Sequence, residues 1–264
     1  MIKLIATDMD GTLLDGNGNI PKEFFSTLDK LNKKDIKFAV ASGRPYPTLY
    51  ENFQPISDDL YFICDNGSYI VEPGKKPIID IIDKKYINKI VQASEKIDGV
   101  NLILCGVKNS YHKPLSEELE ERVSKYYINR KILSNLNDID DDIFKVAIYD
   151  KYGSKENSFN ILNNLFGKDL KVVISGANWL DINNKGINKG YAIKKVQEDF
   201  NILYENSMVF GDFYNDIEML QCAYYSFVME NANDEIKQYG NFIAKKNTEN
   251  GVIKAIEEYV LKED

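Results

Sequence analysis

The stretch MIKLIATDMDGTLLD, residues 1–15, combines an apolar run with two closely spaced carboxylates. An apolar-rich run over residues 2–6 leads to two carboxylates, Asp8 and Asp10, and the chain then turns at Gly11 and Thr12. This pattern predicts a short buried strand that ends in acid. Two carboxylates at such a strand end cost stability through desolvation and mutual repulsion unless a cation or a proton compensates them. We therefore expect the rest of the chain to supply the compensation.

Length, charge and hydropathy limit the classes of protein that the chain can belong to. Its 264 residues are enough for one large domain or for a core with a second domain. A formal net charge of -8, with 33 Lys and Arg residues spread along the chain, argues against a nucleic-acid partner. No window approaches the ~18 apolar residues of a membrane span, and the N-terminus predicts a strand, not a signal peptide. We expect a cytoplasmic protein without a membrane partner, either a monomer or a weak homo-oligomer.

The scarcity of histidine and cysteine narrows the chemistry. His112 is the single histidine, so a zinc site with several histidines is impossible. The three cysteines are far apart in apolar surroundings, which is typical of reduced core residues. Neither a GxGxxG loop after a strand nor a GxxxxGK[ST] loop is present. Any catalysis is therefore expected to depend on carboxylates.

The strands that follow residue 15 also end in polar residues. A helix opening at Pro21 leads to a buried strand over residues 37–41, which ends in Ser42, Gly43 and Arg44. A third strand, residues 61–64, ends at Asn66 and its neighbours. Alternating strands and helices with short connections predict a parallel sheet with right-handed crossovers, and ligands bind such sheets at the carboxyl ends of the strands. We therefore expect Asp8, Ser42 and Asn66 to lie at one edge.

The middle of the chain predicts a second domain. Two extended runs around Pro73-Gly74 indicate a hairpin, and residues 83–185 then alternate helix and strand more loosely. A buried strand at residues 207–210 resumes the first pattern and ends in GDFYND, residues 211–216. The predicted fold class is α/β, with a Rossmann-like parallel-sheet core formed by residues 1–82 and 186–264. Residues 83–185 are predicted to form an inserted α+β cap domain.

Four strand-end motifs now stand in order: DMDGT (8–12), SGR (42–44), GINKG (186–190) and GDFYND (211–216). Each alone is a weak signal, because caps and turns use the same residues, but all four converge at one sheet edge. Together they make the chain resemble the haloacid dehalogenase superfamily, and more narrowly its Cof-type phosphatases with a C2B cap. Glu230 and Asn250 depart from that pattern, where such proteins usually carry Gly and Asp, so the local loops are expected to differ.

The resemblance implies a nucleophile, a metal and a proton carrier. Asp8 would attack the phosphorus atom and form an aspartyl-phosphate. A carboxylate that attacks an anionic phosphate needs its repulsion screened, which favours Mg²⁺ held by oxygen ligands. By the resemblance, the Asp8 side chain, the Asp10 backbone carbonyl and Asp212 would hold Mg²⁺, with Asp216 behind them. Asp10 would protonate the leaving group and later deprotonate the attacking water.

Other positions are implied to hold the phosphoryl group or the substrate. Fixed donors would stabilise the phosphoryl oxygens: Lys189, Ser42, Asn215 and the backbone amides of Met9 and Gly43. Arg44, Thr12 and Asn66 are possible substrate contacts or supports, and Arg44 is slightly favoured as an ion-pair partner of a nearby acid. The cap is expected to close over the site and exclude water. Four cap residues could face the substrate, although an ordinary structural role is favoured for each: His112, Lys113, Asn178 and Trp179.

The leading hypothesis is a Mg²⁺-dependent phosphomonoester hydrolase that acts on a small phosphorylated metabolite. The candidates are a sugar phosphate or a cofactor such as flavin mononucleotide or pyridoxal phosphate. A phosphomutase of the phosphomannomutase type is the nearest alternative, because it shares the Asp-x-Asp motif. A regulatory module that binds phosphometabolites without turnover is disfavoured, because Asp8, Asp10 and Asp212 are all present.

Overall fold

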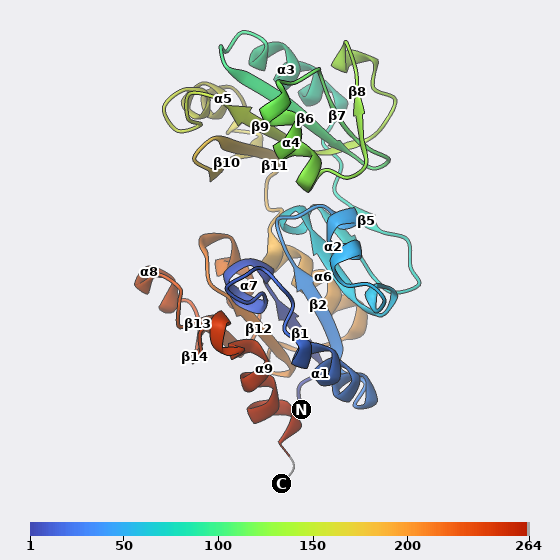
Figure 1. Cartoon of the computed structure of the whole chain (residues 1–264), viewed down its shortest axis with the longest axis vertical. Helices are drawn as coiled ribbons and strands as arrows, with labels where there is room; N and C mark the ends of the chain where they lie inside the picture. Colours follow the sequence, from blue (N-terminus) through green and yellow to red (C-terminus); the bar gives the residue numbers. More distant parts are fainter. Residues whose placement is uncertain (263–264) are drawn as a thin grey trace. The chain divides into compact units, whose positions relative to one another are not determined.

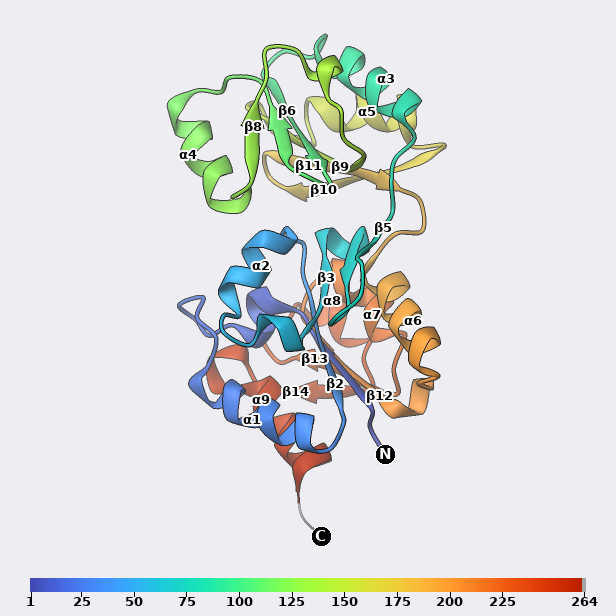
Figure 2. The same cartoon turned by 90° about the vertical axis from the view of Figure 1, so that its right-hand side faces the viewer.

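The computed structural model describes residues 1–262 and divides into two compact units (Figures 1 and 2). The first, here called the core unit, comprises Met1–Tyr46, Phe53–Pro77 and Asn188–Asp264. The second, here called the inserted unit, comprises Pro47–Asn52 and Ile78–Ile187. We propose that the core unit is the catalytic domain and that the inserted unit is its cap.

An eight-stranded sheet organises the core unit, in the order β14-β13-β12-β1-β2-β3-β4-β5, and its last strand, β5, is formed by residues assigned to the inserted unit. The pairs from β14 to β3 are parallel, and β4 is antiparallel to β3. Along the chain, β2 to β5 are added on one side of β1, and β12 to β14 are added later on the other side. The strand order therefore reverses between β1 and β12, and open α/β sheets bind ligands at such a point. The strands are β1 (Leu4–Thr7), β2 (Lys37–Ala41), β3 (Tyr61–Cys64), β4 (Tyr69–Val71), β5 (Ile78–Ile79), β12 (Ser207–Gly211), β13 (Tyr225–Met229) and β14 (Phe242–Ala244).

Helices cover both faces of this sheet, which explains why its central strands are apolar throughout. On one face Phe24 packs its ring edge against Phe38 of β2, with ring centroids 5.2 Å apart. On the other face Ala192 and Ile193 pack with Leu4 and Ala6 of β1. Figure 2 shows α1 and α9 on one side of the strands and α6 and α7 on the other. The helices of the core unit are α1 (Lys22–Lys33), α6 (Lys189–Phe200), α7 (Ile217–Leu220), α8 (Asp234–Lys237) and α9 (Gly251–Ile256). Helix α2 (Tyr46–Asn52) begins at the last residue of a core segment, and its other residues are assigned to the inserted unit.

The inserted unit has its own six-stranded sheet, in the order β10-β11-β9-β6-β7-β8. Its core joins residues of α3 and α5, such as Ile90 and Leu162, to the sheet residues Leu104 and Val146. Two short strands, β7 and β8, were not predicted from the sequence. The elements are α3 (Lys84–Ser94), α4 (Glu117–Tyr126), α5 (Ser158–Phe166), β6 (Val100–Gly106), β7 (Ser110–His112), β8 (Arg130–Ile132), β9 (Ile143–Asp150), β10 (Leu170–Gly176) and β11 (Trp179–Asn184).

The predicted fold class, an α/β protein with a largely parallel sheet, is confirmed. Element ends differ by a few residues, which is usual where helices fray. The last predicted helix, for example, is α-helical only in α9 and continues as a wider π-helical turn over Glu257–Leu261. Within residues 1–262 no helix is both long enough and apolar enough to span a membrane.

Candidate active site

The carboxyl ends of β1 and β12 bring two of the predicted acids into one cluster. Thr7 pairs with Phe210 in the parallel ladder, and the backbone N–H of Asp8 donates to the Phe210 carbonyl at 3.0 Å. Asp8 therefore directly follows β1, and Asp212 directly follows β12. One carboxylate oxygen from each of Asp8, Asp212 and Asp216 lies within 4.8 Å of the others.

Lys189 supplies a positive charge next to the Asp8 carboxylate. It is the first residue of α6, whose N-cap, Asn188, accepts a hydrogen bond from the backbone N–H of Tyr191 at 2.8 Å. The Lys189 ammonium donates to Asp8 Oδ1 at 2.5 Å and to Asp216 Oδ1 at 2.7 Å. The Lys189 side chain is fully buried, so Lys189 is not a solvated helix residue.

Asp216 holds the other members of the cluster in place. Its Oδ2 accepts the backbone N–H groups of Asp212 and Phe213, both at 3.0 Å, while its Oδ1 accepts from Lys189. Asp212 is fixed a second time, because the hydroxyl of Thr12 donates to its Oδ1 at 2.8 Å. Thr12 therefore supports an acid of the cluster, one of the two roles expected for it.

The turn Met9–Leu13 needs glycine at its centre. Gly11 has φ +83°, in the left-handed region that favours glycine. A Cβ atom at this position would also overlap Oδ2 of Asp212. The backbone of the DMDGT motif thus approaches the carboxylate of the GDFYND motif more closely than any side chain would permit.

The second and third strand ends supply polar groups linked to one another. Ser42 is buried, its Oγ accepts the backbone N–H of Arg44 at 3.2 Å, and its carbonyl accepts the N–H of Asn66 at 3.0 Å. Asn66 has φ +56°, and its Oδ1 accepts from Nδ2 of Asn215 at 3.0 Å. A Cβ on Gly43 would lie 3.3 Å from Nδ2 of Asn66, so Gly43 also sits against this pair. Met9 is fully buried in the turn, and its carbonyl accepts the N–H of Leu14 at 2.9 Å.

Arg44 forms an ion pair with Asp10, as the favoured interpretation of Arg44 expects. Its Nε donates to Asp10 Oδ2 at 3.0 Å and its Nη2 to Asp10 Oδ1 at 2.6 Å. The Asp10 side chain is 60% exposed, whereas that of Asp8 is only 10% exposed. The two acids of the DxD motif therefore differ in environment: one contacts buried Lys189, and the other contacts Arg44 near solvent.

Burial sets the protonation behaviour of the cluster. It raises the pKa of Asp8 to about 8, against the opposing effect of Lys189 and with a further rise from Asp216 and Asp212. Burial likewise raises the pKa of Asp212 to about 6, although the Thr12 hydrogen bond lowers it. For Lys189, burial opposes the charged form, but the carboxylates of Asp216 and Asp8 outweigh it and the pKa is raised. Three acids around one ammonium leave excess negative charge that a proton or a cation can balance.

The donor set of this cluster fits a hard divalent cation. Its ligand atoms are all carboxylate oxygens, the type that Mg²⁺ and Ca²⁺ prefer. The absence of a side chain at Gly11 leaves room for the Asp212 carboxylate. Asp216 already uses both oxygens on Lys189 and on backbone amides, so it supports a cation site from behind.

One positioning residue was not assigned a role from the sequence. Asn231 donates from Nδ2 to the Gly11 carbonyl at 2.8 Å and accepts the backbone N–H of Asn247 at 3.0 Å. Asn247 in turn donates to the Leu14 carbonyl at 2.9 Å. These hydrogen bonds tie the DMDGT turn to the two loops that carry Asn231 and Asn247.

Glu230 and Asn250, which depart from the family pattern, both lie in short loops outside the carboxylate cluster. Glu230 is exposed, and its N–H donates to the Ala244 carbonyl at 2.9 Å. Asn250 adopts φ +58° just before α9, a conformation that Asn tolerates better than most residues. Neither residue contacts the carboxylate cluster in any hydrogen bond described here.

The four cap residues considered as substrate contacts have structural partners. His112 is fully buried in β7, and its Nδ1 lies 2.8 Å from the Lys113 carbonyl, which fits the structural role favoured for it. Lys113 pairs with Glu95 at 2.6 Å. Asn178 donates to the Asp150 carbonyl at 2.7 Å, and Trp179 packs edge-on against Tyr149. These contacts agree with the structural roles favoured for them.

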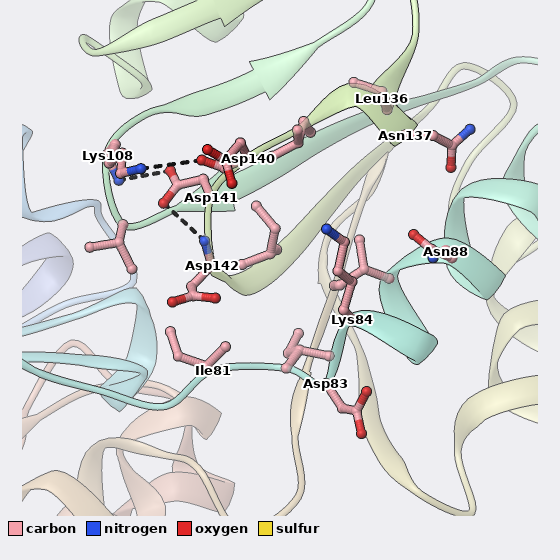
Figure 3. A pocket seen from close by; sticks show the side chains of 15 residues that line it. Ile81, Asp83, Lys84, Asn88, Lys108, Leu136, Asn137, Asp140, Asp141 and Asp142 are labelled. Atoms are coloured by element: carbon pink, nitrogen blue, oxygen red, sulfur yellow. Dashed lines mark hydrogen bonds between the residues drawn. The ribbon is translucent and has the colours of Figure 1, made fainter.

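A pocket of about 410 Å³ lies in the inserted unit, and no predicted site residue lines it (Figure 3). Its lining includes the apolar residues Ile87 and Ile143 and the acidic residues Asp140, Asp141 and Asp142. The Asp141 carboxylate is used within its own loop, where it accepts from the Lys108 N–H at 2.8 Å and from the Tyr111 hydroxyl at 3.0 Å. The Asp141 carboxylate therefore has a structural role, and the chemistry is better placed at the cluster of Asp8, Asp212 and Asp216.

The fold and the cluster define a hydrolase class that comparison with known proteins identifies. The family model for haloacid dehalogenase-like hydrolases matches residues 5–256, and the chain belongs to this family. The expected superfamily and the expectation of an enzyme are thereby confirmed. The structure is similar to the crystal structure of SMU.1108c from Streptococcus mutans UA159, with TM-score 0.89 and 31% identity over 99% of this chain and 100% of that one.

Its sequence relatives are named phosphatases. The 5-amino-6-(5-phospho-D-ribitylamino)uracil phosphatase YbjI of Escherichia coli (strain K12) is 29% identical, covering 100% of this chain and 97% of the relative. The phosphatase YcsE of Bacillus subtilis (strain 168), named for the same compound, is 27% identical, covering 98% and 96%. The chain thus matches these enzymes along its whole length.

Proposed function

We propose that the protein is a Mg²⁺-dependent phosphomonoester hydrolase that works through an aspartyl-phosphate on Asp8. The observation that supports it most is the contact of buried Asp8 with Lys189 at 2.5 Å, beside Asp212 and Asp216. A nucleophilic carboxylate, a fixed cation and an acidic metal site then meet at one strand end. Phosphoryl transfer depends mainly on such positioning and charge stabilisation.

In the first half-reaction, an Asp8 oxygen forms a bond to phosphorus while the bond from phosphorus to the ester oxygen breaks. Asp10 gives its proton to the departing alkoxide, and the product alcohol leaves. Lys189 holds Asp8 in the attacking position and offsets the charge on the transferring group. Ser42, Asn215 and the backbone amides of Met9 and Gly43 are the proposed donors to the phosphoryl oxygens.

In the second half-reaction, Asp10 accepts a proton from water as the water oxygen attacks phosphorus. The bond between phosphorus and Asp8 breaks, inorganic phosphate leaves and the free Asp8 carboxylate is restored. The residues proposed to hold the metal are Asp8, Asp212 and the Asp10 backbone carbonyl, with Asp216 supporting them. When bound, Mg²⁺ would screen the repulsion between the carboxylate and the phosphate and polarise the phosphoryl oxygens.

The proposed substrate is a small phosphorylated metabolite. Two relatives that match the whole chain are named for a phosphorylated ribitylamino-uracil, which favours this compound as the first to test. A sugar phosphate, flavin mononucleotide and pyridoxal phosphate complete the panel. The ranking of kcat/KM across the panel identifies the substrate, because kcat/KM measures discrimination between substrates.

The proposal is tested by phosphate release from p-nitrophenyl phosphate and from the panel, with Mg²⁺ and with EDTA. Asp8→Asn should abolish turnover, while Asp29→Asn, which changes an exposed acid on α1, should leave it unchanged. Rapid quenching of the wild-type enzyme should trap phosphate on Asp8. Full activity of Asp8→Asn, or full activity in EDTA, would refute the mechanism.

A separate assay distinguishes the mutase alternative. A phosphomutase would convert a sugar 1-phosphate to the 6-phosphate and would require a sugar 1,6-bisphosphate. We expect net phosphate release without this activator.

A further inference from the structure

We propose that Arg44 is a positioning residue that aims the Asp10 carboxylate at the leaving-group oxygen. This inference rests on the proposed function, in which Asp10 carries the proton. It goes beyond that function because it gives Arg44, at the end of β2, the task of orienting Asp10.

Asp10 needs such a partner because its own surroundings restrain it little. Its side chain is 60% exposed, and it follows a backbone that has already left the strand, with φ -74° and ψ 115°. An exposed aspartate exchanges among rotamers, so only a fraction of molecules would point the carboxylate correctly at any moment. Proton transfer requires the carboxyl oxygen within hydrogen-bond reach of its target.

The planar guanidinium of Arg44 restricts the rotation of the Asp10 side chain. Its Nε and Nη2 contact different oxygens of Asp10, at 3.0 and 2.6 Å, which fixes both the direction and the plane of the carboxylate. A lysine could contact Asp10 but could not fix that plane, because an ammonium is a point charge without a fork. When Asp10 carries a proton, one of the two contacts can remain and preserve the direction.

The backbone of Arg44 is itself anchored. Its N–H donates to the Ser42 hydroxyl at 3.2 Å, and its carbonyl accepts the N–H of Asp65 at 3.1 Å. Its side chain is 24% exposed, much less than that of Asp10. The parallel pairing of β1 with β2 places the two strand ends side by side, although Asp10 and Arg44 are 34 residues apart. The guanidinium is therefore the more rigid partner and can impose its orientation on Asp10.

The test compares two substrates that differ in leaving group but little in size, p-nitrophenyl phosphate and phenyl phosphate. Nitrophenolate leaves readily without a proton, whereas phenolate is more basic and depends more on Asp10. Arg44→Lys and Arg44→Gln should therefore lower kcat/KM for phenyl phosphate about 10-fold more than for p-nitrophenyl phosphate. The parameter kcat/KM is used because it reports the phosphorylation half-reaction. The ratio of the two values does not depend on how much of a preparation is folded.

Two controls complete the experiment. Arg122→Lys alters an exposed ion pair with Glu118 on α4 and should leave the ratio unchanged. In an Asp10→Asn background, Arg44→Lys should cause no further change in the ratio, because the residue to be aligned has lost its function. An additional drop there would show that Arg44 acts on something other than Asp10.

The outcomes separate this inference from the proposed function. If Arg44→Lys lowers both substrates alike, or leaves both unchanged, the positioning role is wrong. A parallel loss with a raised KM would instead indicate that Arg44 binds the phosphoryl group. If the wild-type enzyme releases no phosphate from either ester, the proposed function fails first.

Discussion

Removal of the Lys189 ammonium is the sharpest perturbation of the cluster. Lys189 is fully buried, and its Nζ donates to Asp8 at 2.5 Å and to Asp216 at 2.7 Å. Lys189→Met preserves most of the length and the apolar stem of the side chain while deleting the charge. The substitution leaves Asp8, Asp212 and Asp216 close together without the internal cation.

The expected loss of stability is large. Removing one partner of a buried ion pair costs about 3–5 kcal/mol, because the remaining charge stays buried without compensation. Native domains have unfolding free energies of about 5–15 kcal/mol, so the loss is a substantial fraction of the total. Part of it should be recovered in Lys189→Met/Asp216→Asn, since the second change removes one of the stranded carboxylates.

The assay is urea denaturation in EDTA, which yields the free energy of unfolding of each variant without a bound metal. Lys194→Met, an exposed position on the same helix, is the matched control and should remain within about 0.5 kcal/mol of wild type. A Lys189→Met protein within about 1 kcal/mol of wild type would refute the reasoning. So would a double variant less stable than Lys189→Met alone.

Three further predictions concern the same site. Gly11→Ala should lower the unfolding free energy more than Gly18→Ala does, and it should weaken Mg²⁺ binding measured by titration calorimetry. The reason is that both glycines have positive φ, but only at Gly11 would a Cβ meet Asp212. Equal effects of the two changes would contradict this. Because the folded-state pKa of Asp8 is raised from 3.8 to about 8, its contribution to stability is fully present below pH 3.8 and is lost as the pH rises through 8. Asp8→Asn should therefore gain stability relative to wild type as the pH rises from 5 to 8 in EDTA, by up to about 1 kcal/mol per pH unit. Denaturation curves without this trend would contradict the raised pKa of Asp8. Asn231→Ala, which removes bonds to Gly11 and Asn247, should cost about 1–2 kcal/mol and lower kcat/KM, whereas Asn241→Ala should affect stability alone.

Local sequence was sufficient for most of the core unit. The apolar runs at residues 37–41, 61–64 and 207–210 predicted β2, β3 and β12 to within one residue, because strands buried on both faces need continuous apolar side chains. The weaker predictions lie in the inserted unit. β7 and β8 have three residues each and pair with each other in parallel, 20 positions apart, so no local window contains the signal that forms them.

The surroundings of His112 have the same physical origin. His112 is fully buried in β7, which lies between β6 and β8 in the sheet. Its Nδ1 contacts the adjacent Lys113 carbonyl. The pattern of apolar and polar residues in the sequence does not predict this contact.

By itself the sequence determined the family, the order of the strand-end motifs and the residue types available for chemistry. These are properties of short contiguous segments: apolar runs, turns and the spacing of carboxylates. Only the tertiary structure decided which charge meets which. Asp8 meets Lys189 from 181 positions away, Asp10 meets Arg44, and Asn231 reaches Gly11 across 220 positions. The physical reason is that hydrogen bonds and ion pairs act over a few ångströms in space, and only the register of parallel strands brings such distant positions that close.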